Sequence, residues 1–193
     1  METEILQQRA AASLNVESSI MALSIEHATE LFSIASNRLL SVNKWHTLPC
    51  SLLTELKLTD EKGCEVDRQV RENDYFVVDH DGGNGEWVKV EKVYLHRDPS
   101  GPREVLTVRA KPSNHPLDIS DEHSRPSHTF KVTREGLNIT ASVHGRNEDD
   151  ELNKSFTTDD LNARPDSTVG AIPGVARVQW RSLVHGILST WGQ

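Results

Sequence analysis

The sequence predicts an α+β protein with an N-terminal helix, an antiparallel sheet of six or seven strands and a long C-terminal helix. Three observations support this fold class. Hydrophobic residues recur at helical spacing near the start, runs with period two fill the middle, and one apolar stripe marks the end of the chain. Because 36% of the 193 residues are hydrophobic, the chain can bury a core without disulfides or a structural metal.

The N-terminal part is predicted to contain an arm, an extended segment and a helix. Residues 1–13 are polar and are expected to form an arm, whereas residues 14–193 are expected to form a single domain. Residues 14–23 can be extended. Ser24 then offers an N-cap to a helix with apolar residues at helical spacing, namely Ile25, Ala28, Leu31, Phe32, Ala35 and Leu39.

The middle of the chain alternates with period two, as strands with one buried face do. Short segments with turn-forming residues separate most of these runs. In the run 87–95, Val88 is expected on one face, and Trp87 and Val93 on the other. The predicted strands cover residues 52–58, 65–70, 75–78, 87–95, 104–109, 129–134 and 137–143.

The C-terminal helix is the clearest predicted element. Pro173 suits a first turn, and the apolar residues after it form one stripe, namely Ala176, Trp180, Leu183, Val184, Ile187, Leu188 and Trp191. This stripe has to be buried, and one face of the preceding sheet is the only surface large enough. Residues 145–170, which are rich in acidic side chains, are expected to form a mobile loop before the helix.

Charge and cysteine content narrow the function classes. Twenty-one basic and 29 acidic side chains give a net charge of −8, which disfavours nucleic acid and anionic membranes as partners. No apolar run reaches the ~20 residues of a membrane span, and no secretory signal is recognisable. We therefore expect a cytoplasmic location, in which Cys50 and Cys64 are reduced and structural.

The order of these elements resembles the helix-grip superfamily of START and Bet v 1-type proteins. Sequence features that resemble the superfamily lie within about 19–45, where an aliphatic and aromatic helix precedes Trp45, and within about 174–191. The resemblance implies a curved sheet that grips the C-terminal helix around an apolar cavity. It also implies that Trp180, Val184 and Ile187 face this cavity, with Trp45 near one end.

Other candidate ligand-binding residues come from the predicted strands. His144 and Arg146 lie where the last strand meets the acidic loop, and a rigid sheet can position polar groups at such a junction. Tyr94 and Phe130 are aromatic residues of predicted strands and complete the candidate set.

Metal and cofactor sites find no support in the sequence. His115, His123 and His128 share a predicted loop region with acidic residues, but their spacing matches no metal-binding motif. The glycines at 82–85 are not followed by the residues of a phosphate-binding loop. We therefore predict neither a metal nor a cofactor.

The preferred function is non-catalytic binding of a small hydrophobic or amphipathic molecule between the sheet and the C-terminal helix. The first alternative is a structural or interaction protein that forms a homo-oligomer or binds another protein through the N-terminal arm or the acidic loop. The second alternative is an enzyme of the cyclase, isomerase or hydrolase type that uses the same cavity, with His144, Arg146 or His185 as its polar residues.

Overall fold

The structure, a computed structural model, describes residues 14–78, 85–99, 101–118, 127–146, 172 and 175–190. Two helices, one 3-10 helix and seven strands follow one another in these ranges. In chain order they are β1 (Asn15–Met21), α1 (Ile25–Leu40), the 3-10 helix η1 (Val42–Thr47), β2 (Leu56–Thr59), β3 (Tyr75–Val78), β4 (Glu86–Arg97), β5 (Arg103–Ser113), β6 (Ser127–Glu135), β7 (Asn138–Arg146) and α2 (Arg177–Leu188).

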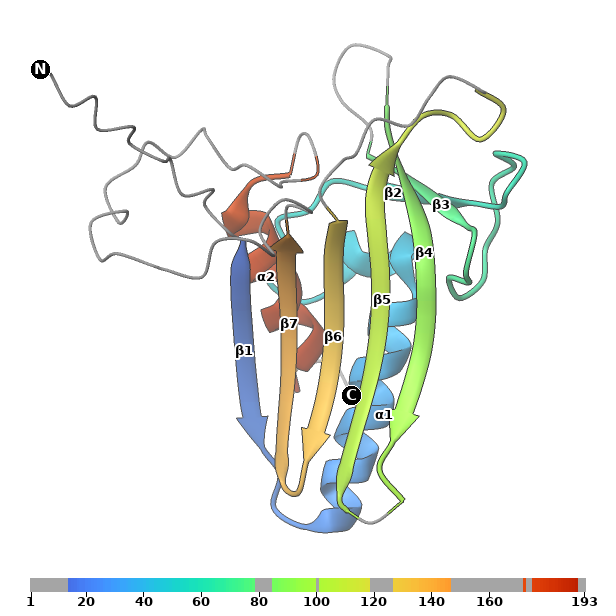
Figure 1. The fold of residues 1–193 in the computed structure, drawn as a ribbon. Helices are drawn as coiled ribbons and strands as arrows, with labels where there is room; N and C mark the ends of the chain where they lie inside the picture. The colour runs from blue at the N-terminus through green and yellow to red at the C-terminus, as the bar shows by residue number, and fades with distance from the viewer. Residues whose placement is uncertain are drawn as a thin grey trace, which may run out of the picture.

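The seven strands form one antiparallel sheet in the order β1-β7-β6-β5-β4-β3-β2. Strands β2 to β7 follow one another as neighbours, whereas β1 pairs with β7, so that the first and last strands in sequence lie side by side. Both helices lie on one side of the sheet (Figure 1). We call the side that faces them the inner face and the opposite side the outer face. The prediction of an α+β fold with six or seven antiparallel strands is confirmed.

A β-bulge in β4 reverses the predicted faces of its second half. The pairing of β4 with β5 is interrupted at Glu91, which is an extra residue on β4. Beyond the bulge, Val93 pairs with Val108, a buried residue of the inner face. Val93 therefore lies on the same face as Val88, and the prediction that they lie on opposite faces is wrong.

Helix α1 begins where the sequence predicts. Ser24 adopts an extended backbone, and its side chain accepts a hydrogen bond from the backbone N–H of His27. The apolar stripe of α1 packs mainly on β6, and its buried residues are Ala28, Leu31, Phe32, Ala35 and Leu39.

The C-terminal helix is also confirmed, but it is the shorter of the two helices. It spans 12 residues, against 16 for α1, and covers β1 and β7 rather than the whole sheet. The inner face is therefore shared between two helices. Five residues of the predicted stripe are buried as expected, namely Trp180, Leu183, Val184, Ile187 and Leu188, whereas Ala176 is the exposed N-cap residue before α2. Pro173 and Trp191 lie outside the described residues.

Two predicted strands differ from the structure around β2. Residues 65–70 form only an isolated bridge, from Glu65 to Thr59, because the pairing with β2 ends after Val66, and Val70 bonds to the carbonyl of Leu40 instead. The Asn43 side chain donates to the carbonyl of Val66. The predicted strand 52–58 begins only at Leu56, since residues before it bond to α2 instead.

The last turn of α1 connects α1 to α2 and η1. Arg38 donates from Nη1 to the carbonyls of Gly186, Ile187 and Ser189, over 3.4, 3.1 and 2.5 Å. The indole N–H of Trp45 bonds to the carbonyls of Arg38 and Leu39, each at 3.1 Å. Carbonyls at a helix end need such partners because they have none within the helix.

Several sequence predictions fall outside the described residues. These are the arm 1–13, the glycine loop except for Gly85, and the acidic loop beyond residue 146, since β7 extends through Arg146. Cys50 and Cys64 form no disulfide, and both are exposed. Among the described helices, none is long and apolar enough to cross a membrane.

Hydrophobic side chains are also exposed at the end of the molecule where β1 joins α1. Met21 and Leu23 are 71% and 90% exposed, and Ile25 is half-exposed.

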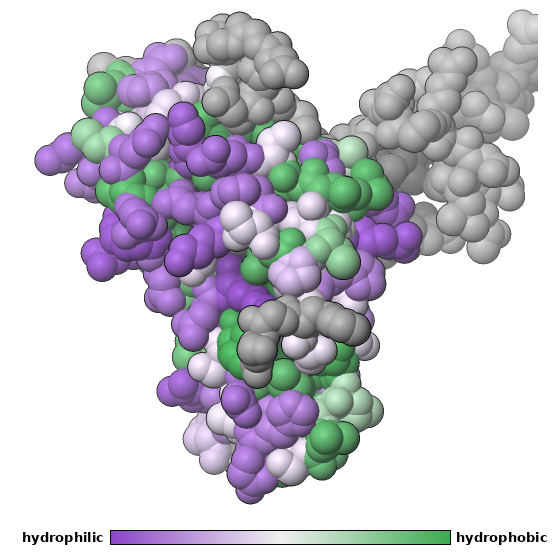
Figure 2. Space-filling model, turned by 180° about the vertical axis from the view of Figure 1, so that it is seen from behind, coloured by the Kyte–Doolittle hydropathy of each residue, from purple (hydrophilic) through white to green (hydrophobic). Residues whose placement is uncertain are grey.

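Figure 2 shows the side covered by the helices, where small hydrophobic patches lie between hydrophilic residues.

Gly186 marks the closest approach between α2 and the chain before β2. A Cβ atom at this position would lie 2.9 Å from both the Cβ of Leu48 and the carbonyl oxygen of Pro49.

Replacing Gly186 with alanine brings a gain and a cost. Alanine favours a helix over glycine by about 1 kcal/mol, but here the close approach to Leu48 and Pro49 costs more than this gain in helix propensity. We predict that Gly186→Ala lowers the free energy of unfolding by about 1–2 kcal/mol, measured by urea denaturation. Gly101→Ala is the control, because its Cβ would meet only the Asp98 side chain. An equal effect of both variants would contradict this reading of the contact.

Candidate functional site

A chain of aromatic rings crosses the interior between the sheet and the helices. Trp45 of η1 lies 5.9 Å from Phe76 of β3 and 5.3 Å from Phe130 of β6, between ring centroids. Phe130 in turn lies 5.3 Å from Trp180 of α2, with the rings edge to face. All four rings are fully buried. We call these residues the aromatic chain.

The sheet register places the middle of this chain. Phe130 pairs with Val108 on β5 and with Val143 on β7, all on the inner face. Trp180 comes from the first turn of α2, where the side chain of Gln179 accepts a hydrogen bond from the backbone N–H of Ala176. The aromatic chain therefore brings together four elements that are distant in sequence, namely η1, β3, β6 and α2.

His128 lies at the Trp180 end of the aromatic chain. Its ring is fully buried, with its centroid 6.3 Å from that of Trp180. In the register it is opposite Ala110 on one side and Gly145 on the other. Two small residues thus flank a histidine on the inner face of the sheet.

The polar atoms of this pair have no hydrogen-bond partner in the described part of the chain. These atoms are Nδ1 and Nε2 of His128 and Nε1 of Trp180. Burial lowers the pKa of His128 from 6.5 to about 4, so the ring is neutral at pH 7. A neutral imidazole offers one donor and one acceptor, and the indole offers a second donor. We call His128 and Trp180 the inner polar pair.

The structure brings together five of the eight predicted ligand-binding residues. Trp45, Phe130 and Trp180 belong to the aromatic chain. Val184 and Ile187 lie on the same buried face of α2 as Trp180. These are the residues that the helix-grip resemblance implied, together with Phe130.

Tyr94 and His144 do not belong to this interior group. Tyr94 is half-exposed and pairs with Thr107 on the outer face, because the bulge at Glu91 changes the alternation. His144 also lies on the outer face, where its ring bonds to Asn15 and to Ser142, each at 2.9 Å. Their assignment to a cavity under the C-terminal helix is therefore wrong.

The remaining predicted polar residues are placed as follows. Arg146 ends β7, and its side chain lies outside the described residues. His185 is exposed on α2, with Nδ1 3.3 Å from the hydroxyl of Ser18. Burial is the main cause that lowers the pKa of His144, and the charge of Lys131 lowers it further, against the opposite effect of Glu17.

The sequence analysis missed His128 because it assigned this residue to a loop. The structure extends β6 back to Ser127, so His128 is part of a strand. The signal was present, since Phe130 and Val132 are apolar and His128 continues their alternation. His115 lies outside the strands, His123 lies outside the described residues, and no group of metal-ligating residues occurs in the described ranges.

Comparison with known proteins gives structural neighbours only. No family model and no curated protein matches the sequence. The chain is similar to the hypothetical protein jhp0584 from Helicobacter pylori, with a TM-score of 0.44 and 10% identity over 72% of this chain and 71% of that one. It is also similar to Ara h 8.0201, with a TM-score of 0.36 and 12% identity over 93% of this chain and 100% of that one.

At TM-scores this low, neither neighbour assigns the chain to a fold family. Membership of the helix-grip superfamily therefore stays a prediction, and the function proposed below depends on the chain's own residues.

His128 should make the stability of the fold depend on pH. The unfolded chain protonates this histidine below about pH 6.5, whereas the folded chain protonates it only near pH 4. The contribution of neutral His128 to the free energy of unfolding is therefore fully present above pH 6.5. It falls by about 3 kcal/mol as the pH decreases toward 4. Urea denaturation at pH 7, 5.5 and 4 measures this loss.

His128→Phe should remove that part of the pH dependence, because the ring remains but the titrating group does not. Phe130→Leu is the control, since it weakens packing in the same strand and should keep the slope with pH. If His128→Phe retained the full slope, the buried neutral state of His128 would be refuted.

Proposed function

We propose that this protein binds a small amphipathic molecule whose polar group pairs with His128 and Trp180. The observation that carries the proposal is the set of three buried polar atoms on these two residues without a partner in the described chain. A ligand hydroxyl can both donate to the imidazole and accept from the indole.

The energy of burial supports a missing partner. A buried donor or acceptor without a hydrogen bond costs about 1–3 kcal/mol, and native structures pair the large majority of such groups. The two neighbouring rings of the inner polar pair carry three such atoms. A bound molecule that supplies the missing hydrogen bonds would recover much of this cost.

The apolar part of the ligand would contact the aromatic chain. Phe130 lies edge to face with Trp180, and Trp45 continues the rings toward β3. Aromatic and flat apolar molecules suit such walls. Burial of their apolar surface would stabilise the complex, since each buried methylene contributes about 0.8 kcal/mol. Ala110 and Gly145, which pair with His128 on the two neighbouring strands, have little or no side chain on this part of the inner face.

Entry would occur near the beginning of α2. This end of the helix is held by single side-chain bonds, from Arg177 to the carbonyl of Asn15 at 3.2 Å and from Gln179 to the carbonyl of Leu52 at 3.1 Å. The other end is fixed by the three bonds of Arg38. We infer that the first turn of α2, which carries Trp180, moves to admit the ligand.

A binding role fits this pair better than catalysis. A histidine that transfers protons usually has a partner that orients its ring. Within the described ranges, His128 has no such carboxylate or hydroxyl partner. With a pKa of about 4 it would also be a weak base at neutral pH.

A titration with 1-naphthol tests the proposal directly. This probe combines an apolar double ring with one hydroxyl, and its binding should quench the fluorescence of Trp180. Naphthalene, which lacks the hydroxyl, should bind about five- to tenfold more weakly, since one or two hydrogen bonds are lost. His128→Phe should reduce this difference at pH 7, because it takes away the imidazole and leaves only the indole N–H of Trp180 for the hydroxyl.

His144→Gln is the matched control, because this histidine lies on the outer face of the neighbouring strand. It should leave naphthol binding unchanged. Equal affinity for 1-naphthol and naphthalene in the unmodified protein, or an equal loss in His144→Gln, would refute the assignment of the inner polar pair. Native mass spectrometry of detergent-free protein should additionally reveal a bound molecule that His128→Phe does not retain.

A further inference from the structure

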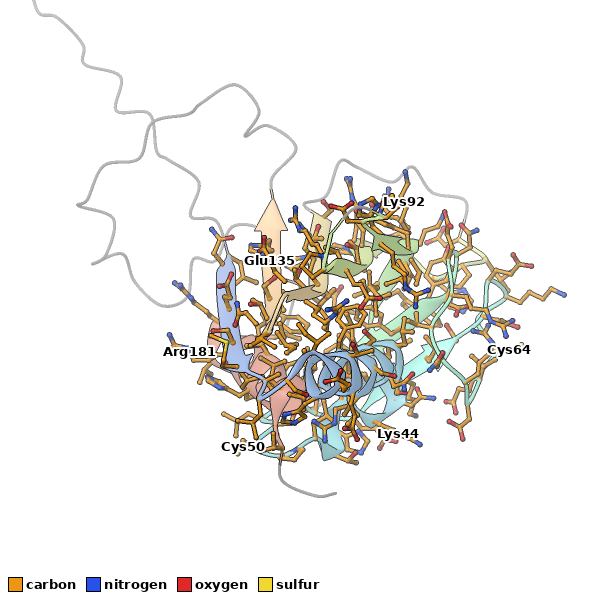
Figure 3. All side chains as sticks on the ribbon, turned by 90° about the horizontal axis from the view of Figure 1, so that it is seen from below. Lys44, Cys50, Cys64, Lys92, Glu135 and Arg181 are labelled. Atoms are coloured by element: carbon orange, nitrogen blue, oxygen red, sulfur yellow. The ribbon has the colours of Figure 1, made fainter. Side chains whose placement is uncertain are left out.

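A groove of about 590 Å³ lies on the outer face of the sheet, away from the inner polar pair. Side chains from β4, β5 and β6 line it in two adjacent rows. The first row is Lys92, Arg109 and Thr129, and the second is Tyr94, Thr107 and Lys131. Figure 3 shows Lys92 on the side of the sheet opposite α1. We call these six residues the outer groove.

The outer groove carries three positive charges in a chain with a net charge of −8. The antiparallel register places Lys92 beside Arg109, and directly opposed side chains have Cβ atoms ~5 Å apart. Like charges at this distance repel one another. Of the described residues that line the groove, Glu72 is the one carboxylate.

Among the residues that the structure describes, no carboxylate neutralises the two lysines, so they can bind an external anion. Arg109 already bonds to Glu91, with Nε to Oε2 at 3.0 Å. Lys92 and Lys131, in contrast, have no ion pair with any carboxylate of the described chain. The positive charge of Lys131 also contributes to lowering the pKa of His144 on the next strand. The groove therefore has positive charge that the described residues do not neutralise.

Thr107 provides an independent sign of a missing partner. It is only 2% exposed although it lies on the outer face, and its hydroxyl is buried without a hydrogen bond in the described chain. In the register it lies between Tyr94 and Lys131. An oxygen atom of an anion at the floor of the groove would accept this hydrogen bond.

We propose that the outer groove binds the phosphate group of a small aromatic phosphate ester. Lysines bind phosphate groups as point charges, and a dianion gains more from two such charges than a monoanion does, whereas the planar fork of arginine matches carboxylate and phosphate alike. Here the arginine is already engaged by Glu91, so the available groups are Lys92, Lys131 and the Thr107 hydroxyl. The half-exposed ring of Tyr94 lies beside them and can pack against an aromatic group.

Isothermal titration with phenyl phosphate at low salt tests this site in the full chain. Phenyl phosphate should bind more tightly than inorganic phosphate, which lacks the ring, and more tightly than benzoate, which is a planar monoanion. Affinity should fall as KCl is raised, because the attraction is electrostatic. Phenol should not compete, since it lacks the anionic group.

Three variants identify the residues that bind. Lys131→Gln and Lys92→Gln should each weaken phenyl phosphate binding about tenfold, as expected for a hydrogen bond to a charged group. Thr107→Val keeps the shape of the side chain and should weaken binding of both phosphates several-fold. Tyr94→Leu should affect phenyl phosphate but leave inorganic phosphate unchanged.

Arg181→Gln is the matched control, because it removes one positive charge from the exposed side of α2 (Figure 3). It should bind phenyl phosphate as the unmodified protein does. If Arg181→Gln lost as much affinity as Lys131→Gln, the change in net charge alone would explain the loss, and the proposal would be overturned. Absence of saturable binding by phenyl phosphate would also overturn it, as would tighter binding of benzoate.

Discussion

Arg38 joins the two helices of this protein through its guanidinium, which bonds to three carbonyls at the end of α2. Those carbonyls carry the negative end of the helix dipole, so a cation is favourable there. Burial lowers the pKa of Arg38, but an arginine remains charged throughout the physiological range. The same turn of α1 also accepts the indole N–H of Trp45. The positions of α2 and η1 over the sheet thus depend on one helix end.

This arrangement explains why the interior residues meet although they are far apart in sequence. Arg38 fixes the end of α2 from which Val184 and Ile187 project, and Trp45 reaches from η1 to Phe130. Gly186 lets α2 approach the segment before β2 without a side chain between them. Among the described residues, the first turn of α2 is held by single bonds from Arg177 and Gln179, which is why the proposed movement is assigned to that end.

Local patterns predicted the helices well because their causes are local. Ser24 and the stripe of α1 are read directly from neighbouring residues, as is the stripe of α2. The sheet depends on longer-range pairing. No local pattern in the sequence indicates that Asn15 pairs with His144, nor that the carbonyl of Val66 accepts a hydrogen bond from the Asn43 side chain.

The candidate site was predicted in part for a related reason. Alternation within a strand identifies a face only while its phase is unbroken. The bulge at Glu91 changes the phase in β4, so Tyr94 lies on the outer face rather than the inner one. In β6 the phase is unbroken, and it would have placed His128 beside Phe130 had the strand been extended by two residues.

The hairpin between β6 and β7 sets both faces at once. Gly136, at a φ of 60°, makes the tight turn that pairs Glu135 with Asn138. Counting back along β6 from this turn puts Lys131 on the outer face and Phe130 and His128 on the inner face. A shift of the register by one residue would bury Lys131 and expose Phe130, which the hydrophobic core strongly opposes. The fixed register therefore keeps an uncharged polar pair on one side of the sheet and unneutralised lysines on the other, so the two proposed sites can be altered separately.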